Sequence, residues 1–229
     1  MIKIPYHLGI IIDGNRRWAR KRGLPSFEGH RRGLEKVKEI GKWCKKRGVK
    51  ILTLFAFSTE NWNRSKAEVS YLMRLFRQIL IKDNLREIHR EGIRIKIIGQ
   101  KQRLNPQLQK VIREAEETTK NNKEGILNIA INYGGRAEIV EAIKKIIRKK
   151  ISTNKINEEL IKKNLWTEEE PYPDLIIRTG GEQRLSNFLL WQAAYSEFYF
   201  PKKYWPDFTE EDLDEALRNY AQRQRRFGK

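Results

Sequence analysis

Asp13 stands out because it is an acid in a strongly basic stretch of the chain. It directly follows the apolar run Gly9–Ile12, and four arginines and one lysine follow it within nine residues. A carboxylate among so many cations is typical of a site that binds an anion with the help of a metal, because guanidinium groups contact phosphate oxygens and the carboxylate holds the cation. The stretch therefore predicts a phosphate-containing ligand and a metal ion.

Similar polar groups follow other apolar runs of the sequence. STENWNR follows Lys50–Phe57, YGGR follows Ile126–Asn132, and RTGGEQRLS begins at the end of Asp174–Thr179. These residue types are common in ordinary turns, but their repetition in four loops favours a site. Since the carboxyl ends of parallel strands lie along one edge of a sheet, where ligands bind, we expect these side chains to converge. The expected set is Asp13, Asn15, Arg17, Ser58, Asn61, Arg64, Arg136, Arg178, Arg184 and Ser186.

The elements that must position these residues alternate between two kinds of pattern. Nearly continuous apolar runs predict strands buried on both faces: Tyr6–Ile12, Lys50–Phe57, Ile93–Gly99, Ile126–Asn132, Asp174–Thr179 and the shorter Glu197–Phe200. Helical spacing of apolar residues predicts helices within Gly33–Arg47, Ser65–Arg90, Pro106–Lys120, Ala137–Ile147 and Glu210–Arg226. This order predicts an α/β fold, a single domain over residues 1–229 with a central parallel sheet of about six strands flanked by helices. Lys149–Pro173 is interpreted as a short helix and a loop within that domain.

The composition limits the partners. The formal net charge is +19, which favours nucleic acid, anionic lipid surfaces or diphosphate substrates. A surface rich in Lys and Glu, as in thermophiles, would explain many lysines but fits the clustered arginines less well.

The single cysteine, Cys44, allows no disulfide within the chain and fits a reducing compartment. No apolar run is long enough for a signal peptide or a membrane helix, so we expect a cytoplasmic protein with peripheral membrane contact at most.

Several familiar sites lack their motifs in this sequence. There is no G-x-x-x-x-G-K-[ST] loop, no G-x-G-x-x-G and no D-D-x-x-D pair, and the three histidines lack metal-ligand spacing. Nucleic-acid binding would need a basic stripe with exposed stacking aromatics, whereas these arginines cluster at strand ends, so we expect no nucleic-acid partner. Trp18 and Trp62 follow polar loops, where either core packing or the mouth of an apolar cavity would suit them.

Together the motifs resemble those of the cis-prenyltransferases of the undecaprenyl (polyprenyl) diphosphate synthase type. The matching segments are HLGIIIDGNRRWA, Gly29–His30, LTLFAFSTENWNRS, NIAINYGGRAEI, the segment from Pro173 to Phe200 and RQRRFG, which span nearly the whole chain. The resemblance implies a parallel sheet with an elongated apolar tunnel. It also implies a Mg2+-dependent enzyme that adds isopentenyl diphosphate repeatedly to an allylic diphosphate such as farnesyl diphosphate, giving a Z-polyprenyl diphosphate that serves as a lipid-carrier precursor.

The resemblance also implies roles for individual residues. Asp13 matches the acid that holds magnesium, and Asn61 matches the proposed acceptor of the proton lost in condensation, although an amide is a poor base. Glu197 matches a second magnesium ligand, given across the dimer in some members, and Arg226 and Gly228 match an element that reaches the partner's site, which implies a homodimer. The implied substrate-binding residues are Gly14, Asn15, Arg16, Arg17, Trp18, Ser26, His30, Ser58, Thr59, Glu60, Trp62, Arg64, Arg178, Arg184, Leu185 and Ser186.

Three positions depart from the family pattern. Arg16 stands where many bacterial members have glycine, Ser26 where many carry a phosphate-binding arginine, and Gln183 where some have a histidine near the metal. Arg16 makes this loop more similar to archaeal and eukaryotic relatives. The sequence therefore leaves two alternatives for product length, short products and long dehydrodolichyl-type products. A catalytically idle regulatory subunit is disfavoured because such partners usually lose the acid that Asp13 provides.

Overall fold

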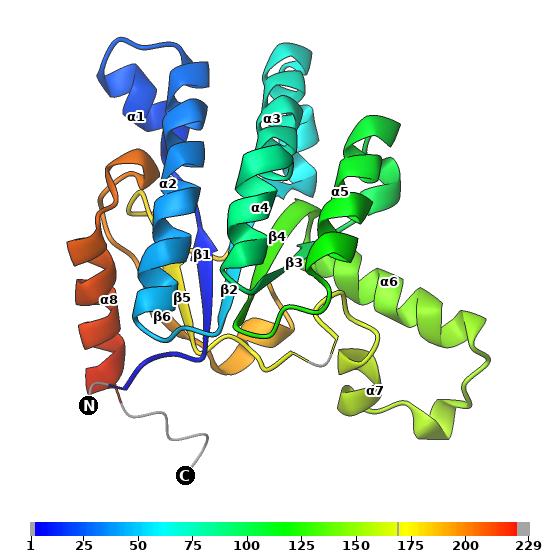
Figure 1. The fold of residues 1–229 in the computed structure, drawn as a ribbon. Helices are drawn as coiled ribbons and strands as arrows, with labels where there is room; N and C mark the ends of the chain where they lie inside the picture. Colours follow the sequence, from blue (N-terminus) through cyan, green and yellow to red (C-terminus); the bar gives the residue numbers. More distant parts are fainter. Residues whose placement is uncertain (1–2, 169, 224–229) are drawn as a thin grey trace.

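The computed structural model describes residues 3–168 and 170–223, and in them six parallel strands form one sheet (Figure 1). The strand order is β3-β4-β2-β1-β5-β6. The strands are β1 (His7–Ile11), β2 (Ile51–Ser58), β3 (Ile93–Ile98), β4 (Gly125–Tyr133), β5 (Leu175–Arg178) and β6 (Glu197–Tyr199). The predicted parallel sheet is confirmed, and each strand begins and ends within one residue of the predicted bounds.

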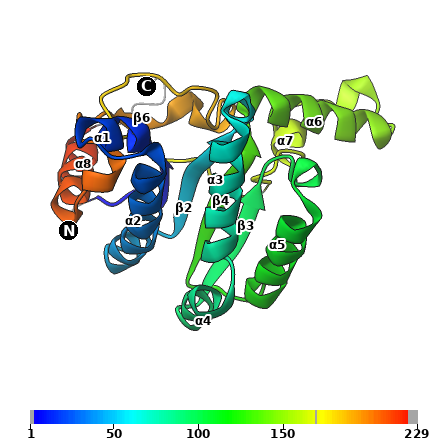
Figure 2. The same ribbon diagram turned by 90° about the horizontal axis from the view of Figure 1, so that it is seen from above.

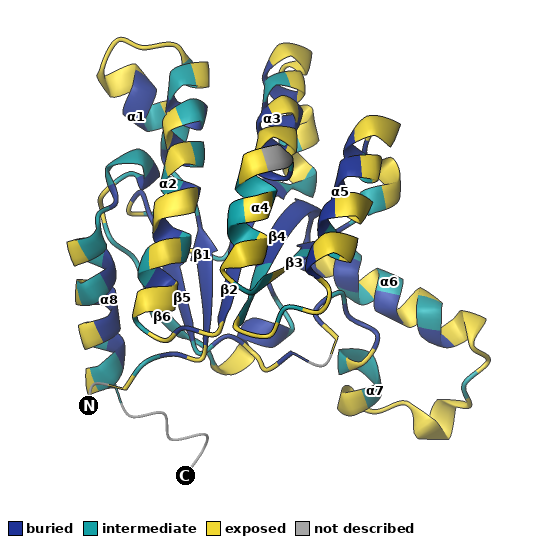
Figure 3. Cartoon of the chain, in the orientation of Figure 1, coloured by how far each residue is buried: buried dark blue, intermediate teal, exposed yellow. Residues whose placement is uncertain are grey.

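Helices cover both faces of the sheet (Figure 2). One face carries α2 (Ser26–Lys46), α3 (Lys66–Ile79), α4 (Lys82–Arg90) and α5 (Pro106–Thr119), with α8 (Glu210–Gln222) toward the β6 edge. The other face carries α6 (Gly135–Arg148), the short α7 (Glu158–Lys162) and the segment 185–195. Because both faces are covered, the central strands are mostly apolar, and all five residues of β1 are buried (Figure 3).

The predicted helix over Ser65–Arg90 is wrong as one element, because the chain forms α3 and α4 with a break at Leu80 and Ile81. No glycine or proline marks the break. Ile81 has extended backbone angles, while Leu80 is only 1% exposed in the core. The side-chain amide of Asn84 donates to the carbonyl of Gln78, which satisfies one of the open carbonyls at the end of α3. The burial of Leu80 and the Asn84 cap therefore set the boundary between α3 and α4, which the spacing of apolar residues does not predict.

The segment after β1 also differs from expectation, since it forms a helix, α1 (Asn15–Lys21), where no helix was predicted. Gly14 introduces it with φ of 104°, and a Cβ there would lie 2.7 Å from a ring carbon of Tyr204. In addition, α2 begins seven residues before the predicted Gly33. Its first turns pack against α1 through Gly29, where a Cβ would lie 2.1 Å from the carbonyl oxygen of Asn15. Glycine carries no apolar signal, so this contact is invisible to a periodicity analysis.

Candidate active site

A cavity of about 820 Å³ opens at the carboxyl ends of the central strands. Of the ten residues expected to converge there, all except Arg184 line it. Its other polar lining residues are Arg16, Arg20, His30, Glu60 and Asn187, and Gly14 and Gly33 also line it. Its apolar wall comes from Leu34, Val37, Leu54, Phe55, Ala56, Leu72, Leu75, Phe76, Ile79 and Ile129, which belong to α2, β2, α3 and β4. The cavity thus joins a basic mouth to an apolar interior.

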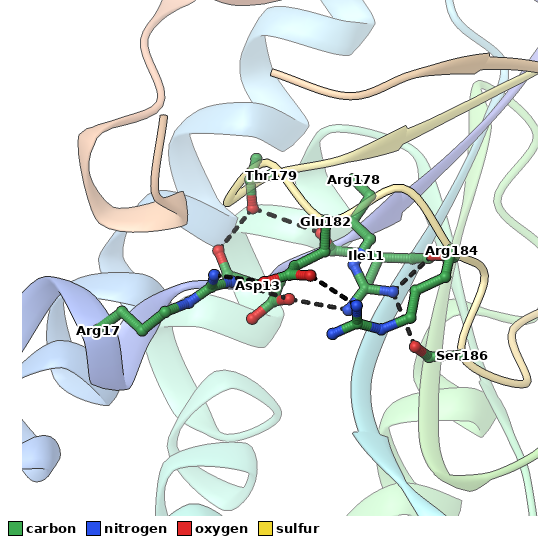
Figure 4. Close-up of polar contacts among 8 residues, drawn as sticks. All are labelled: Ile11, Asp13, Arg17, Arg178, Thr179, Glu182, Arg184 and Ser186. Atoms are coloured by element: carbon green, nitrogen blue, oxygen red, sulfur yellow. Dashed lines mark hydrogen bonds and ion pairs between the residues drawn. The ribbon is translucent and has the colours of Figure 1, made fainter. Parts of the chain in front are cut away.

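Asp13 lies at the centre of the basic mouth (Figure 4). Its Oδ2 accepts a hydrogen bond from Nη2 of Arg178 at 2.9 Å and lies 3.2 Å from Nη2 of Arg17. The hydroxyl of Thr179 donates to the main-chain carbonyl of Asp13 at 2.7 Å, which ties the end of β1 to the end of β5. The carboxylate is therefore held in a fixed place between two guanidinium groups.

Arg178 is buried, although its side chain is charged. It pairs with Ile11 in the register of β5 and β1, which brings its guanidinium next to Asp13. Its Nη1 donates to the hydroxyl of Ser186 at 2.8 Å and to the carbonyl of Arg184. Its buried Nε–H has no hydrogen-bond partner among the described residues.

The loop after β2 forms a short 3-10 helix, Thr59–Asn63, at the rim of the cavity. The main-chain N–H of Ser58 donates to Oδ1 of Asn61 at 3.1 Å, so the Asn61 amide caps the turn. The carboxylate of Glu60 accepts from the side-chain amide of Asn187 at 2.9 Å. This contact links the loop to the segment that carries Ser186.

A buried acid that the sequence did not single out as a site residue, Glu68, completes the mouth. Its Oε1 accepts from Nε2 of His30 at 3.0 Å and from Nη1 of Arg64 at 3.0 Å. In the sequence, Ser65 and Glu68 fit a capping box at the start of α3. In the structure, only the Ser65 hydroxyl makes a cap contact, and the Glu68 carboxylate turns toward His30 and Arg64 instead. From the sequence, Glu68 was therefore expected to cap a helix rather than to contact site residues.

Several predicted site residues lie outside the cavity lining: Trp18, Ser26, Thr59, Trp62, Arg184, Leu185 and Glu197. The indole N–H groups of Trp18 and Trp62 donate to Asp207 and Asn132, away from the cavity. The Arg184 side chain is largely exposed and pairs with Glu182. Arg20, Asn187 and Leu190 line the cavity but were not predicted as site residues. Arg20 lies in the basic stretch after Asp13, which was a signal for it, whereas Asn187 and Leu190 have no local signal in the sequence.

Glu197 lies at the opposite end of the sheet from Asp13. It pairs with Leu175 in the register of β6 and β5, three residues before Arg178, which is about 10 Å at the usual rise of a strand. Its carboxylate accepts from Nη1 of Arg223 at 2.8 Å. Within one chain, Glu197 and Asp13 therefore do not form a pair of metal ligands, and Arg226 and Gly228 lie outside the described residues.

Over residues 3–168 and 170–223, no three or more His, Cys, Asp or Glu side chains gather in a group that could hold a metal ion. In the same ranges, none of the helices has the length and apolar character needed to cross a bilayer.

The fold and the site define a protein class: an α/β protein that binds molecules with an anionic head and an apolar tail at the carboxyl edge of its sheet. Comparison with known proteins narrows this class. The model of the undecaprenyl diphosphate synthase family matches residues 11–228. The chain therefore belongs to the undecaprenyl diphosphate synthase family, a prenyl-transferring enzyme family.

Individual relatives agree with this membership. The isoprenyl transferase of Clostridium perfringens is 52% identical over 230 residues, which cover 99% of this chain and 90% of the relative. The ditrans,polycis-undecaprenyl-diphosphate synthase ((2E,6E)-farnesyl-diphosphate specific) of Legionella pneumophila is 46% identical, covering 99% of this chain and 96% of the relative. The crystal structure of lavandulyl diphosphate synthase from Lavandula x intermedia in complex with dimethylallyl diphosphate superposes with a TM-score of 0.94 at 42% identity, covering 99% of each chain. The chain is thus an isoprenyl transferase with the expected fold.

Proposed function

We propose that this enzyme condenses isopentenyl diphosphate repeatedly with an allylic diphosphate, such as farnesyl diphosphate, to make a Z-polyprenyl diphosphate. The observation that carries the proposal is the joining of the Asp13–Arg178 mouth to an apolar interior in one cavity. A diphosphate with an isoprenoid tail needs both parts. Farnesyl diphosphate, for which the Legionella enzyme is named as specific, and dimethylallyl diphosphate, which is bound in the lavender structure, belong to this chemical class.

In the proposed reaction, the arginines stabilise the charge that develops on the departing diphosphate. The terminal alkene carbon of isopentenyl diphosphate (C4) forms a bond with the allylic carbon as the allylic carbon–oxygen bond breaks and diphosphate leaves. A proton then leaves C2 of the isopentenyl unit, and its bonding electrons form the new double bond between C2 and C3. Arg16 and Arg17 from α1 are assigned to the allylic diphosphate, and Arg178 and Ser186 to isopentenyl diphosphate. Guanidinium groups held beside the diphosphates act by electrostatic stabilisation and positioning.

Magnesium is the proposed cofactor, and Asp13 is the residue that would hold it. Mg2+ is usually bound through one or two carboxylates together with substrate phosphate oxygens, so a lone carboxylate beside a diphosphate site has a suitable donor set. When bound, the ion neutralises charge on the diphosphate. Arg17 and Arg178 contact the same oxygen of this carboxylate, Oδ2, and so hold Asp13 in place for the ion.

Asn61 is the proposed proton acceptor, and the fold fixes its amide. Its Oδ1 already accepts the N–H of Ser58, which leaves one lone pair for a second contact. An amide oxygen is a weak base, so what supports this role is the fixed orientation of the amide rather than its basicity.

We further propose a cytoplasmic homodimer with peripheral membrane contact, in which Glu197, Arg226 and Gly228 serve the partner's site. An exposed apolar stripe on α6 supports an interface with a second copy. Val140, Ile143 and Ile147 are 50%, 44% and 68% exposed, and their spacing of three and four residues places them on one side of the helix. Exposed apolar patches of this kind mark protein contacts.

Incorporation of radiolabelled isopentenyl diphosphate into butanol-extractable lipid, with farnesyl diphosphate as starter, tests the proposal. We expect magnesium-dependent labelling by the wild type and a loss of at least about a thousandfold with Asp13→Asn, since Asp13 is assigned to the metal and the diphosphate site. Asp83→Asn, which changes an exposed aspartate on α4, is the matched control and should keep full activity. Equal labelling in EDTA, or full activity of Asp13→Asn, would refute the assigned roles.

A further inference from the structure

Glu68 places a negative charge beside a site that must attract anions. It lies in the first turn of α3 and is 7% exposed. Burial of a carboxylate is costly unless cations or donors compensate it, and a like charge near a diphosphate weakens binding of that diphosphate. Its position therefore needs a reason that outweighs both costs.

Three separate segments meet at one oxygen of this carboxylate. His30 comes from α2, Arg64 follows the 3-10 helix at the rim, and Arg16 comes from α1. Their Nε2, Nη1 and Nε atoms lie 3.0, 3.0 and 3.9 Å from Oε1 of Glu68. All three of these residues line the cavity, so the groups that Glu68 contacts are groups that a ligand would contact.

Burial and neighbouring charges determine the protonation states in the cluster of Glu68, His30, Arg16 and Arg64. Burial raises the pKa of Glu68, but the hydrogen bond from His30 and the charges of Arg64 and Arg16 outweigh it, so the net pKa lies below the ordinary value. Burial lowers the pKa of His30, which keeps the imidazole neutral near pH 7. With two guanidinium groups against one carboxylate, the cluster keeps a net positive charge while the two cations are held close together.

We propose that Glu68 is a positioning residue, whose carboxylate holds His30, Arg16 and Arg64 in the arrangement that receives the diphosphate of the allylic substrate. The proposal rests on the proposed function. Without the carboxylate, the two guanidinium groups repel each other and the imidazole loses the partner that fixes its ring. The ordered arrangement of three donors outweighs the repulsion between one carboxylate and the substrate.

Binding of farnesyl diphosphate, measured by calorimetry in magnesium buffer without isopentenyl diphosphate, tests this role. If Glu68 contributes only its charge, Glu68→Gln should bind the anionic ligand as tightly as the wild type or more tightly. If Glu68 positions the cluster, we expect Glu68→Gln to bind about tenfold more weakly. Glu35→Gln is the matched control, because Glu35 pairs with Arg31 and Arg32 on α2 outside the cavity lining, and it should bind as the wild type does.

Two further measurements separate positioning from general damage. In Glu68→Gln, the KM for farnesyl diphosphate should rise about tenfold while the KM for isopentenyl diphosphate stays within twofold, which a partly unfolded enzyme would not show. Glu68→Asp keeps the charge but shortens the reach, so it should also weaken binding, and it decides the question if Glu68→Gln does not fold. If the folded variants bind farnesyl diphosphate as tightly as the wild type or more tightly, the positioning role of Glu68 is refuted but the proposed function is not. If the wild type itself does not bind farnesyl diphosphate, the proposed function is refuted.

Discussion

At the scale of single residues, a buried histidine shows how the sheet tolerates polar groups. The Nδ1–H of His7 donates to the carbonyl of Pro171, and its Nε2 accepts from the hydroxyl of Thr53, both at 2.7 Å. Thr53 in turn accepts from the side-chain amide of Asn128, whose other contact is the carboxylate of Glu170. This assignment of donors requires a neutral imidazole, which agrees with the pKa of His7 being lowered by burial.

The neutral imidazole of His7 makes the stability of the protein depend on pH. Below the ordinary pKa of 6.5, the unfolded state takes up a proton at His7 and the folded state does not. The free energy of unfolding should therefore fall with pH, by up to about 1.4 kcal/mol per pH unit for this residue, until the folded pKa is reached. Urea unfolding of His7→Gln between pH 7 and pH 5 should show a shallower slope than the wild type. His89→Gln, which changes an exposed histidine, should keep the wild-type slope, and an unchanged slope in His7→Gln would contradict the assignment.

At the scale of elements, glycines on α2 determine where α1 presents its arginines. A Cβ on Gly33 would lie 2.4 Å from Oδ1 of Asn15 and 3.0 Å from a ring carbon of Trp205. The absence of that carbon lets α1 pack closely on α2, next to the cavity that both helices line. Gly41, two turns further along the same helix, has no heavy atom within 4 Å of the corresponding point.

The two glycines should respond to alanine in opposite directions. Gly33→Ala overpacks the contact with Asn15 and should lower the free energy of unfolding by about 1–3 kcal/mol. Gly41→Ala meets open space in a helix and should raise it by about 0.5–1 kcal/mol, because alanine restricts the unfolded chain. Chemical denaturation of both variants makes the comparison, and destabilisation by Gly41→Ala as large as that by Gly33→Ala would show that the close contact is not the cause.

The sequence predicted the strands well because each is a continuous apolar run that ends in polar residues, as with Ile126–Asn132 against the observed β4. It predicted the convergence of strand-end residues because the parallel order of the sheet places them on one edge. It could not locate contacts that depend on tertiary packing. The break at Leu80, the helix α1 and the turn of the Glu68 carboxylate toward His30 all follow from neighbours distant in the chain.

At the scale of the whole molecule, two layers enclose the space for the product. Ala56 on β2 faces the cavity, and Leu75 and Phe76 reach it from α3. Ala56 is the smallest of the three side chains, so it leaves room for a growing chain between the sheet and the helix.

A larger side chain at Ala56 should therefore shorten the product. Ala56→Leu fills part of the cavity near the mouth, and chromatography of dephosphorylated products should show fewer isoprene units than for the wild type. Ala67→Leu makes the same change at an exposed position of α3 and should leave the distribution unchanged. An unchanged product length in Ala56→Leu would mean that the chain takes another path.

The proposed dimer predicts that two inactive variants can restore activity when their subunits are combined in one dimer. If Arg226 serves the partner's site, Asp13→Asn and Arg226→Ala are each inactive alone but damage different sites in a mixed dimer. The subunit with intact Asp13 would then receive an intact Arg226 from the Asp13→Asn subunit, so one site in each mixed dimer is complete. Equal mixing after dissociation and reassociation should restore about a quarter of the wild-type activity, since half of the dimers are mixed and half of their sites are complete. If Arg226 acts within its own chain, both sites of the mixed dimer stay damaged, and the mixture should show only the mean activity of the two variants.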